Sequence, residues 1–180
     1  IADDGNGILK FSLLLDGTYA VKAGDRASEV TFIEIPSIYK GKPVTQILSN
    51  GFQNLTDLQS ITIPNTIHEV LNDAFVGCTY LKEVRYNGTA TEWSQITFGN
   101  LSANPNAICG NLYINDKLLT EAVIDEGTLE IKDYTFYNCK SMTSLSLPDT
   151  LIAIGGSSFY KTSISDVTIP SSVSRIGAYA

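Results

Sequence analysis

His68 is the only histidine of the 180-residue chain, and it is the first side chain to consider for acid–base catalysis or metal binding. It lies between the apolar residues Ile67 and Val70, so we expect its side chain to point outward. A catalytic triad needs a nucleophile beside the histidine, and a zinc site needs three or four ligands. The sequence supplies neither arrangement, and it predicts no catalytic residue, no metal site and no cofactor.

The three cysteines could support nucleophilic or redox chemistry, but their positions favour a structural role. Cys78 and Cys139 are equivalent positions of a repeated pattern in which an earlier copy has Leu55, which favours buried, apolar side chains. We expect them to lie two coils apart, at about 10 Å, whereas a disulfide needs Cα atoms within about 7 Å. The sequence therefore predicts no bond between them. It does not place Cys109, and an odd number of cysteines leaves at least one free thiol.

The carboxylates are scattered along the chain and do not form the dense alternation of a calcium-binding loop. We interpret them as structural or solvated groups rather than as metal ligands. The most noticeable ones are Asp3, Asp4, Asp116, Asp125, Glu126 and Asp133.

The composition describes a chain that can fold around a core and that carries a negative charge. Hydrophobic residues make up 43% of the chain and charged residues 17%, and the formal net charge is -7. A negative chain does not suit nucleic acid as a partner. No apolar run approaches the roughly 20 residues that a membrane-spanning helix needs, so we expect no membrane insertion by this segment.

Three stretches of the chain repeat one pattern, which predicts a stack of similar units. They are "ITIPNTIHEVLNDAF" at 61–75, "LSLPDTLIAIGGSSF" at 145–159 and "VTIPSSVSRIGAYA" at 167–180. Phe52, Phe75, Phe136 and Phe159 are 23, 61 and 23 residues apart, so the long step holds one irregular unit and one ordinary unit. We expect these four rings to form one internal column.

Each position of the pattern has a physical reason. Ile61 and Ile63 flank Thr62, which predicts a short strand with one buried face, and Pro64 ends the strand because it lacks a backbone donor. The three-residue spacing from Ile67 to Val70 lets the chain turn and point inward twice. A small residue then precedes phenylalanine, so neighbouring backbones can approach while the ring fills the space under the turn.

One unit departs from this pattern at two positions. In the unit that ends at Phe136, Asp125 stands where the others have proline, and Thr128 stands in an apolar position. The first unit also differs, since "YKGKP" at 39–43 adds about five residues after Pro36.

The unit L-x-x-I-x-I-P-x-x-V-x-x-I-x-x-x-A-F-x-x-C-x-x-L resembles the BspA-like leucine-rich repeats of bacterial surface proteins. The resemblance implies a mainly β fold: a right-handed solenoid with one short parallel strand per repeat and short helical or irregular turns. It divides the chain into an N-terminal β-hairpin cap at 1–29, with Asp16-Gly17 as its turn, and a solenoid at 30–180. The solenoid has about six coils and an irregular coil near 86–118, and Ala180 truncates it in mid-repeat.

The resemblance also implies secretion or display on a bacterial cell surface. The sequence begins with Ile1, shows no signal peptide and ends in mid-repeat, so we expect it to be a piece of a longer protein. The last coil presents Val167, Ile169, Val173 and Ile176 without a neighbour. Unless more chain follows, we expect this edge either to be covered by another molecule, for example by end-to-end association, or to be frayed.

The outward positions of the predicted strands are the natural docking surface of a solenoid. They are mostly small hydroxyl residues, whereas tight protein interfaces favour tyrosine, tryptophan and arginine. Binding here would be weak and repeated, or serine and threonine merely suit exposed strands. The predicted partner-binding residues are Phe32, Glu34, Ser60, Thr62, Glu83, Arg85, Glu121, Val123, Ser144, Ser146, Asp166 and Thr168.

The irregular segment Tyr86–Asn115 is an alternative binding region, because it contains Trp93, Tyr86 and Phe98. Two interpretations of Trp93 are open. It is either a partner-binding anchor in an exposed loop or a plug that covers the irregular coil, and the resemblance supports the plug.

Taken together, these features favour a non-enzymatic binding or adhesion module that presents a repeat-built surface to a protein or glycan ligand. Two alternatives are a structural spacer or stalk, and an accessory repeat domain of a larger surface enzyme.

Overall fold

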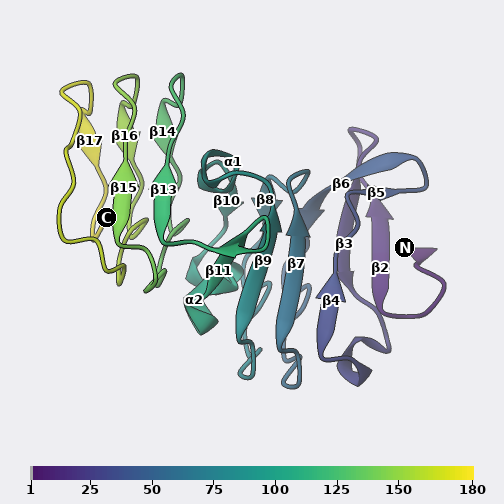
Figure 1. Cartoon of the computed structure of the whole chain (residues 1–180). Coiled ribbons are helices and arrows are strands. Elements are labelled where there is room, and N and C mark those ends of the chain that lie inside the picture. The colour runs from purple at the N-terminus through teal and green to yellow at the C-terminus, as the bar shows by residue number, and fades with distance from the viewer. Residues whose placement is uncertain (1) are drawn as a thin grey trace.

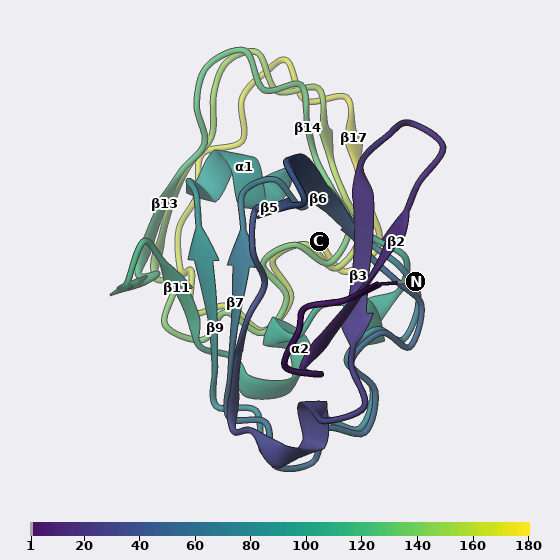
Figure 2. The ribbon, with the colours of Figure 1, turned by 90° about the vertical axis from the view of Figure 1, so that its right-hand side faces the viewer.

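Successive turns of the chain stack side by side into an elongated solenoid in the computed structural model, which describes residues 2–180. Figure 1 shows the coils following one another from the purple N-terminal strands to the yellow C-terminal coil. The view turned by 90° in Figure 2 looks along the stack, where the C-terminal coils lie behind one another and are offset from the N-terminal coils. In both views the C-terminal coils reach further at one end and the N-terminal coils further at the other, so the stack contains a step.

Strands β1 (Ala2–Asp3), β2 (Leu9–Leu13) and β3 (Tyr19–Ala23) are antiparallel neighbours at the N-terminal end. The predicted hairpin is present, because β2 and β3 pair from Leu9↔Ala23 to Leu13↔Tyr19 around the Asp16-Gly17 turn, where Gly17 has a φ of +87°. Strand β3 then pairs in parallel with β6 (Lys42–Ile47). Because this sheet continues into the solenoid, the boundary at residue 29 stays a prediction.

The strand predicted for each repeat forms one long side of the solenoid. There the neighbouring coils pair in parallel, and the register aligns buried apolar residues, as in Ile33↔Ile61 and Ile61↔Val84. A separate parallel pair continues this side beyond the irregular coil. The strands are β4 (Phe32–Glu34), β7 (Ser60–Pro64), β9 (Glu83–Asn87), β11 (Leu112–Ile114) with its antiparallel partner β12 (Lys117–Leu118), then β13 (Glu121–Val123) and β15 (Ser144–Ser146).

A second row of short strands lies on another side of the solenoid, in addition to the strand that the pattern predicts. In one of these coils the Ile67 N–H donates to the Pro64 carbonyl at 3.1 Å and closes a turn. The chain is then extended for two residues, which pair in register with the strand of the neighbouring coil. Strand β6 pairs with the first strand of this row, and β5 (Ile38–Tyr39) pairs antiparallel with β6. The members of the row are β8 (Glu69–Val70), β10 (Thr97–Phe98), β14 (Glu130–Ile131), β16 (Ala153–Ile154) and β17 (Arg175–Ile176).

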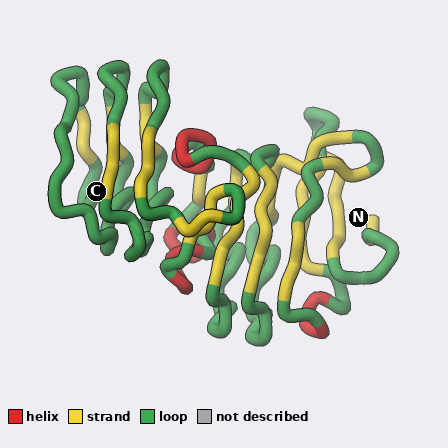
Figure 3. The backbone as a smooth tube through the Cα atoms, viewed as in Figure 1, coloured by secondary structure: helices red, strands yellow, loops and turns green. Residues whose placement is uncertain are grey.

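Helices are few and short, as Figure 3 shows in red. They lie before the first repeat and in the irregular coil, whereas the regular coils turn through loops. They are η1 (Ala27–Glu29), α1 (Ala90–Ser94), η2 (Leu101–Ala103) and α2 (Asn106–Cys109). The mainly β, leucine-rich-repeat fold class that the sequence predicts is confirmed.

The expected column of phenylalanines is observed as two stacks rather than one. Phe52 stacks on Phe75, and Phe136 stacks on Phe159, each pair with ring centroids 5.4 Å apart. Between the stacks, the N–H of Phe75 donates to the Ser102 carbonyl at 3.1 Å, just as the N–H of Phe52 donates to the Ala74 carbonyl. Ala103 therefore takes the position of phenylalanine in the irregular coil, which leaves space for another large side chain.

Candidate functional site

The predicted partner-binding residues, except Trp93, lie at accessible positions, and all of these except Asp166 and Thr168 are on strands. Outward side chains of neighbouring strands form two rows that the strand register aligns, Phe32–Ser60–Glu83 and Glu34–Thr62–Arg85. Beyond the irregular coil the rows continue as Glu121–Ser144 and Val123–Ser146. We call these residues, with Tyr113 and Asp116 described below, the sheet surface. Phe32 is 59% exposed and Val123 54%, so two apolar side chains stand out on it.

Asp166 and Thr168 are exposed beside this surface, but their segment forms no strand with β15. They line a hollow of about 300 Å³ with Ser146 and Asp149. The sheet surface therefore consists of well-paired strands up to β15, and the last coil adds side chains without extending the sheet.

Arg85 holds an ordered cluster at the middle of the sheet surface. Its Nε donates to the Glu83 carboxylate at 2.9 Å and its Nη1 to Asp116 at 2.8 Å, while its guanidinium lies 4.8 Å from the centre of the Tyr113 ring. The hydrogen bond from Arg85 lowers the pKa of Glu83, and hydrogen bonds to the two carboxylates raise the pKa of Arg85. The charges are thus fixed in place at neutral pH, and the arginine is held against a tyrosine.

Sequence reasoning missed Tyr113, although a signal for it exists. Tyr113 alternates with Leu112 and Ile114 in "NLYIND", which indicates one outward side chain on a short strand. Asn115 and Asp116 follow with positive φ values of +45° and +65°, the backbone of a tight hairpin turn. The turn brings the Asp116 carboxylate back to Arg85, and pairing of β11 with β9 sets Tyr113 beside it.

Trp93 is the exception among the predicted binding residues, because its side chain is fully buried. Its Nε1 donates to the Thr135 carbonyl at 2.6 Å, and its ring lies 5.1 Å from that of Tyr86 and 5.5 Å from that of Phe98. The prediction of a partner-binding Trp93 is therefore wrong. The side chain fills the space left where Ala103 replaces phenylalanine, as the plug interpretation requires.

Local sequence explains how Trp93 reaches this position. Thr89 caps helix α1 by accepting from the N–H of Glu92 at 3.1 Å, and the Glu92 carboxylate accepts from the N–H of Thr89 at 2.8 Å. This capping box starts a single helical turn that directs Trp93 inward. Tyr86 and Phe98 are buried as well, so Tyr113 is the one large aromatic side chain of the alternative binding region at Tyr86–Asn115 that a partner could reach.

Comparison with known proteins gives the family. Residues 45–108 and 106–180 match the sequence model described as "BspA type Leucine rich repeat region (6 copies)". This match extends over more than half of the chain. The chain belongs to the BspA-type leucine-rich repeat family. No curated protein matches it.

Solved structures of bacterial repeat proteins share the fold. A "leucine rich cell surface protein" from Faecalibacterium prausnitzii is 28% identical, with a TM-score of 0.58, and the match covers 96% of this chain and 50% of that protein. A leucine-rich repeat protein from Eubacterium ventriosum is 18% identical, with a TM-score of 0.54 over 98% of this chain and 50% of that protein. This leucine-rich repeat chain thus spans about half the length of these relatives.

The side chains first considered for chemistry do not converge in the leucine-rich repeats. His68 is exposed, as expected, and no group of three or more histidine, cysteine or acidic side chains within residues 2–180 is arranged to hold a metal ion. Within the same residues, no helix is both long and apolar enough to cross a membrane.

The cysteines are free, and two of them are buried as predicted. The Cys78 thiol donates to the Phe52 carbonyl at 3.0 Å, and the Cys139 sulfur accepts from the Asn106 amide at 3.0 Å. Burial raises the pKa of both thiols, and it also raises the pKa of the half-buried Cys109. The thiolate, which is the nucleophile, is therefore scarce at all three positions.

We expect Ellman's reagent at pH 8 to label Cys78 and Cys139 only after unfolding, with Cys109 reacting slowly in the native chain. The same measurement in urea should count all three thiols. Immediate labelling of Cys139 in the native chain would contradict its burial.

The last coil has the open apolar surface that the sequence predicts. Val167, Ile169 and Ile176 are exposed, and with Phe159 and Leu147 they line a hollow of about 490 Å³. End-to-end association through this coil stays a prediction.

Proposed function

We propose that this chain is a non-enzymatic, protein-binding module displayed at a bacterial cell surface, and that it binds through the sheet surface. The family supports a binding repeat, and the Faecalibacterium prausnitzii relative carries the words "cell surface" in its name.

The ordered Arg85 cluster is the observation that carries this proposal. Binding energy concentrates on arginine, tyrosine and tryptophan at the centre of an interface. Arg85 and Tyr113 are neighbours there, and Glu83 and Asp116 hold the Arg85 guanidinium against the Tyr113 ring before any partner arrives. Pre-fixed side chains lose less conformational entropy on binding. Ser60 and Thr62 on the neighbouring strand have small side chains and lie in register with Glu83 and Arg85.

Replacement of Arg85 and Tyr113 by alanine tests the proposal. We expect binding to a panel of host matrix proteins, measured by biolayer interferometry, to weaken about tenfold or more. Arg26→Ala is the matched control, because Arg26 also pairs with a neighbouring glutamate, Glu29, but lies away from the sheet surface. Equal binding by the double variant and the wild type would overturn the assignment of this surface.

The same measurement, extended to a panel of glycans, separates the proposal from its rivals. Binding to none of the proteins, together with binding by a longer repeat array, would make this segment a spacer. Binding to glycans alone, with the double variant unaffected, would assign another ligand class and another surface.

A further inference from the structure

A groove of about 570 Å³ lies at the step of the solenoid, between helix α1 and the turn that joins β13 to β14. We call it the step groove. It exists because the turn has different neighbours on its two sides. Toward the C-terminus an equivalent turn packs against it, and Thr150 Oγ1 accepts from the Gly127 N–H and donates to the Thr128 carbonyl. Toward the N-terminus helix α1 stands instead. The groove is lined by Thr91, Gln95, Asp125, Glu126, Gly127, Thr128, Leu129 and Glu130.

The chain departs from its own repeat pattern at this groove. Asp125 stands where the other units have Pro64, Pro148 and Pro170, and Thr128 stands where they have an apolar residue. Two apolar, core-directed positions have thus become polar in the unit whose turn borders the groove. Both polar replacements occur beside the groove, so we consider what the fold requires at these two positions.

The fold accounts for part of this change. The backbone N–H of Asp125 donates to Thr91 Oγ1 at 2.9 Å, which ties the turn to helix α1 and excludes proline at this position. Any other residue could make this bond, however, since it uses only the backbone. The Asp125 side chain is exposed and accepts no hydrogen bond within residues 2–180. Docking against α1 therefore does not require a carboxylate.

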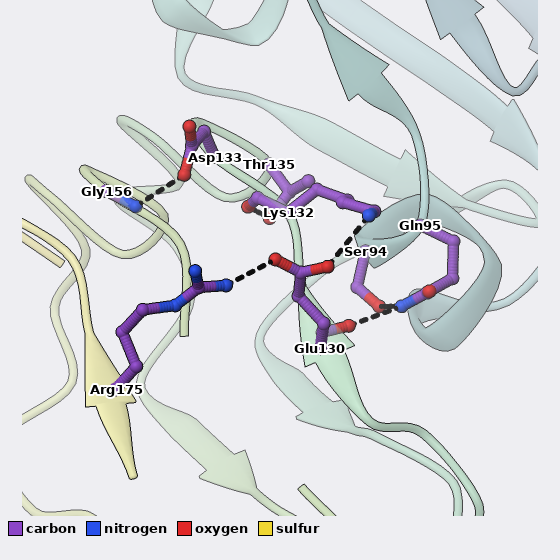
Figure 4. A network of polar contacts seen from close by, with 8 residues as sticks. All are labelled: Ser94, Gln95, Glu130, Lys132, Asp133, Thr135, Gly156 and Arg175. Atoms are coloured by element: carbon purple, nitrogen blue, oxygen red, sulfur yellow. Dashed lines mark hydrogen bonds and ion pairs between the residues drawn. The ribbon is translucent and has the colours of Figure 1, made fainter. Parts of the chain in front are cut away.

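Charges around the step groove are unbalanced toward the negative. Figure 4 shows Glu130 between Lys132 and Arg175, with oxygen–nitrogen distances of 2.8 and 3.0 Å, so both cations are already paired. Glu126 is exposed and accepts only the N–H of Asp149, at 3.2 Å. No lysine or arginine lines the groove. Asp125 and Glu126 thus present two carboxylates to solvent without a neutralising neighbour.

The groove also offers apolar surface and an amide. Leu129 is 57% exposed, and beside it in the next coil Ile152 is 46% exposed. The side-chain amide of Gln95 already donates to the Glu130 carbonyl at 2.8 Å, as Figure 4 shows, which fixes the wall on the α1 side. A long side chain with an apolar stem and a cationic head matches this combination, because the stem covers leucine and isoleucine while the head reaches the carboxylates.

We propose that the step groove binds an arginine- or lysine-bearing segment of a partner protein, at a site separate from the sheet surface. The stem packs on Leu129, and the charged head pairs with Asp125 and Glu126. The other ligand classes fit less well. A metal ion lacks three converging ligand side chains among residues 2–180, and a sugar finds no aromatic ring in the groove lining on which to stack.

The test is a nuclear magnetic resonance titration of the whole chain with a short peptide of alternating arginine and glycine. We expect saturable shifts of the amide signals of Thr91, Gln95, Gly127 and Leu129, and weaker binding as salt is raised. Asp125→Asn with Glu126→Gln keeps the backbone bonds and should lower the affinity about tenfold. Leu129→Ser should also lower it, by a smaller factor.

A control of equal charge decides whether the effect is local. Asp16→Asn with Asp57→Asn removes two exposed carboxylates that make no ion pair within the described chain, and it should leave the affinity unchanged. Equal losses in the two double variants would show general attraction to an acidic protein and overturn the proposal. Shifts at the same amides with chitotriose but not with the arginine peptide would overturn it too.

Discussion

Replacement of Trp93 by alanine is expected to lower the free energy of unfolding by about 3–5 kcal/mol. The indole is fully buried and contacts the rings of Tyr86 and Phe98, so its removal leaves a cavity at the centre of the stack. Repeat proteins are stabilised by contacts between neighbouring coils. Because Trp93 reaches the Thr135 carbonyl of the next coil, we also expect the unfolding transition to separate into two steps.

Urea titrations followed by far-ultraviolet circular dichroism measure both effects. Tyr80→Ala is the matched control, since Tyr80 is an aromatic residue at 64% exposure, and it should change stability by less than about 0.5 kcal/mol. Trp93→Phe should cost less than alanine, because the phenyl ring fills part of the cavity. In both variants the Thr135 carbonyl keeps a partner, since Asn104 Nδ2 also donates to it at 3.2 Å. A single transition with wild-type stability for the alanine variant would show that the coil does not depend on the indole.

Much of the regular solenoid could be predicted from the sequence because its pattern is periodic. The alternation at Ile61 and Ile63 gave the strand, and the small residue before Phe75 gave the close packing of the turn. The second strand row was not predicted, because two residues such as Glu69–Val70 pair only once their neighbours are in register. That register is set by contacts between coils and not by local propensity.

The irregular coil is where sequence reasoning was least informative. The burial of Trp93 depends on a carbonyl 42 residues further along the chain and on the absence of a phenylalanine at Ala103. Neither follows from the spacing of residues near Trp93. The step groove also depends on contacts that are distant in the sequence. The sequence shows that Asp125 and Thr128 depart from the repeat pattern, but the groove beside them is evident only once the position of α1 is known. The sheet surface was mostly predicted, and Tyr113 was missed because its strand lies outside the regular pattern.

Two buried asparagines join the irregular coil to the next one, and they are the basis of the second large effect. In regular coils the carbonyls around the phenylalanine turn accept from backbone N–H groups, as Ala74 does from Phe52. At this junction side-chain amides of the irregular coil donate to the carbonyls, instead of its backbone N–H groups. Asn104 Nδ2 donates to the Tyr134 carbonyl at 2.7 Å, and Asn106 Nδ2 donates to the Tyr137 carbonyl at 2.9 Å.

Asn104→Leu is expected to lower the free energy of unfolding by about 2–4 kcal/mol, although leucine has nearly the same volume. The substitution leaves the Asn106 N–H without the Oδ1 acceptor that lies 2.9 Å away, and it removes the amide donor of the Tyr134 carbonyl, which then accepts only from the Tyr137 N–H. Buried polar groups without partners each cost about 1–3 kcal/mol. Thermal and urea unfolding measure the loss. Asn111→Leu is the control, because Asn111 also donates to a carbonyl of a neighbouring coil, Lys82, but is exposed to water, and it should cost less than about 1 kcal/mol.

Asn104→Asp separates the hydrogen bond from the shape of the side chain. Aspartate keeps the size and the acceptor, but its carboxylate would face the Tyr134 and Thr135 carbonyls in a buried position. Burial and these carbonyls should raise the pKa of this carboxyl in the folded chain above its unfolded value, so folding favours the protonated form. The deficit relative to the wild type should therefore be large at pH 7 and shrink as the pH falls toward the unfolded pKa, because a protonated carboxyl can donate. A deficit that is independent of pH would mean that Asn104 acts through packing alone, and the amide would then not be the link between the two coils.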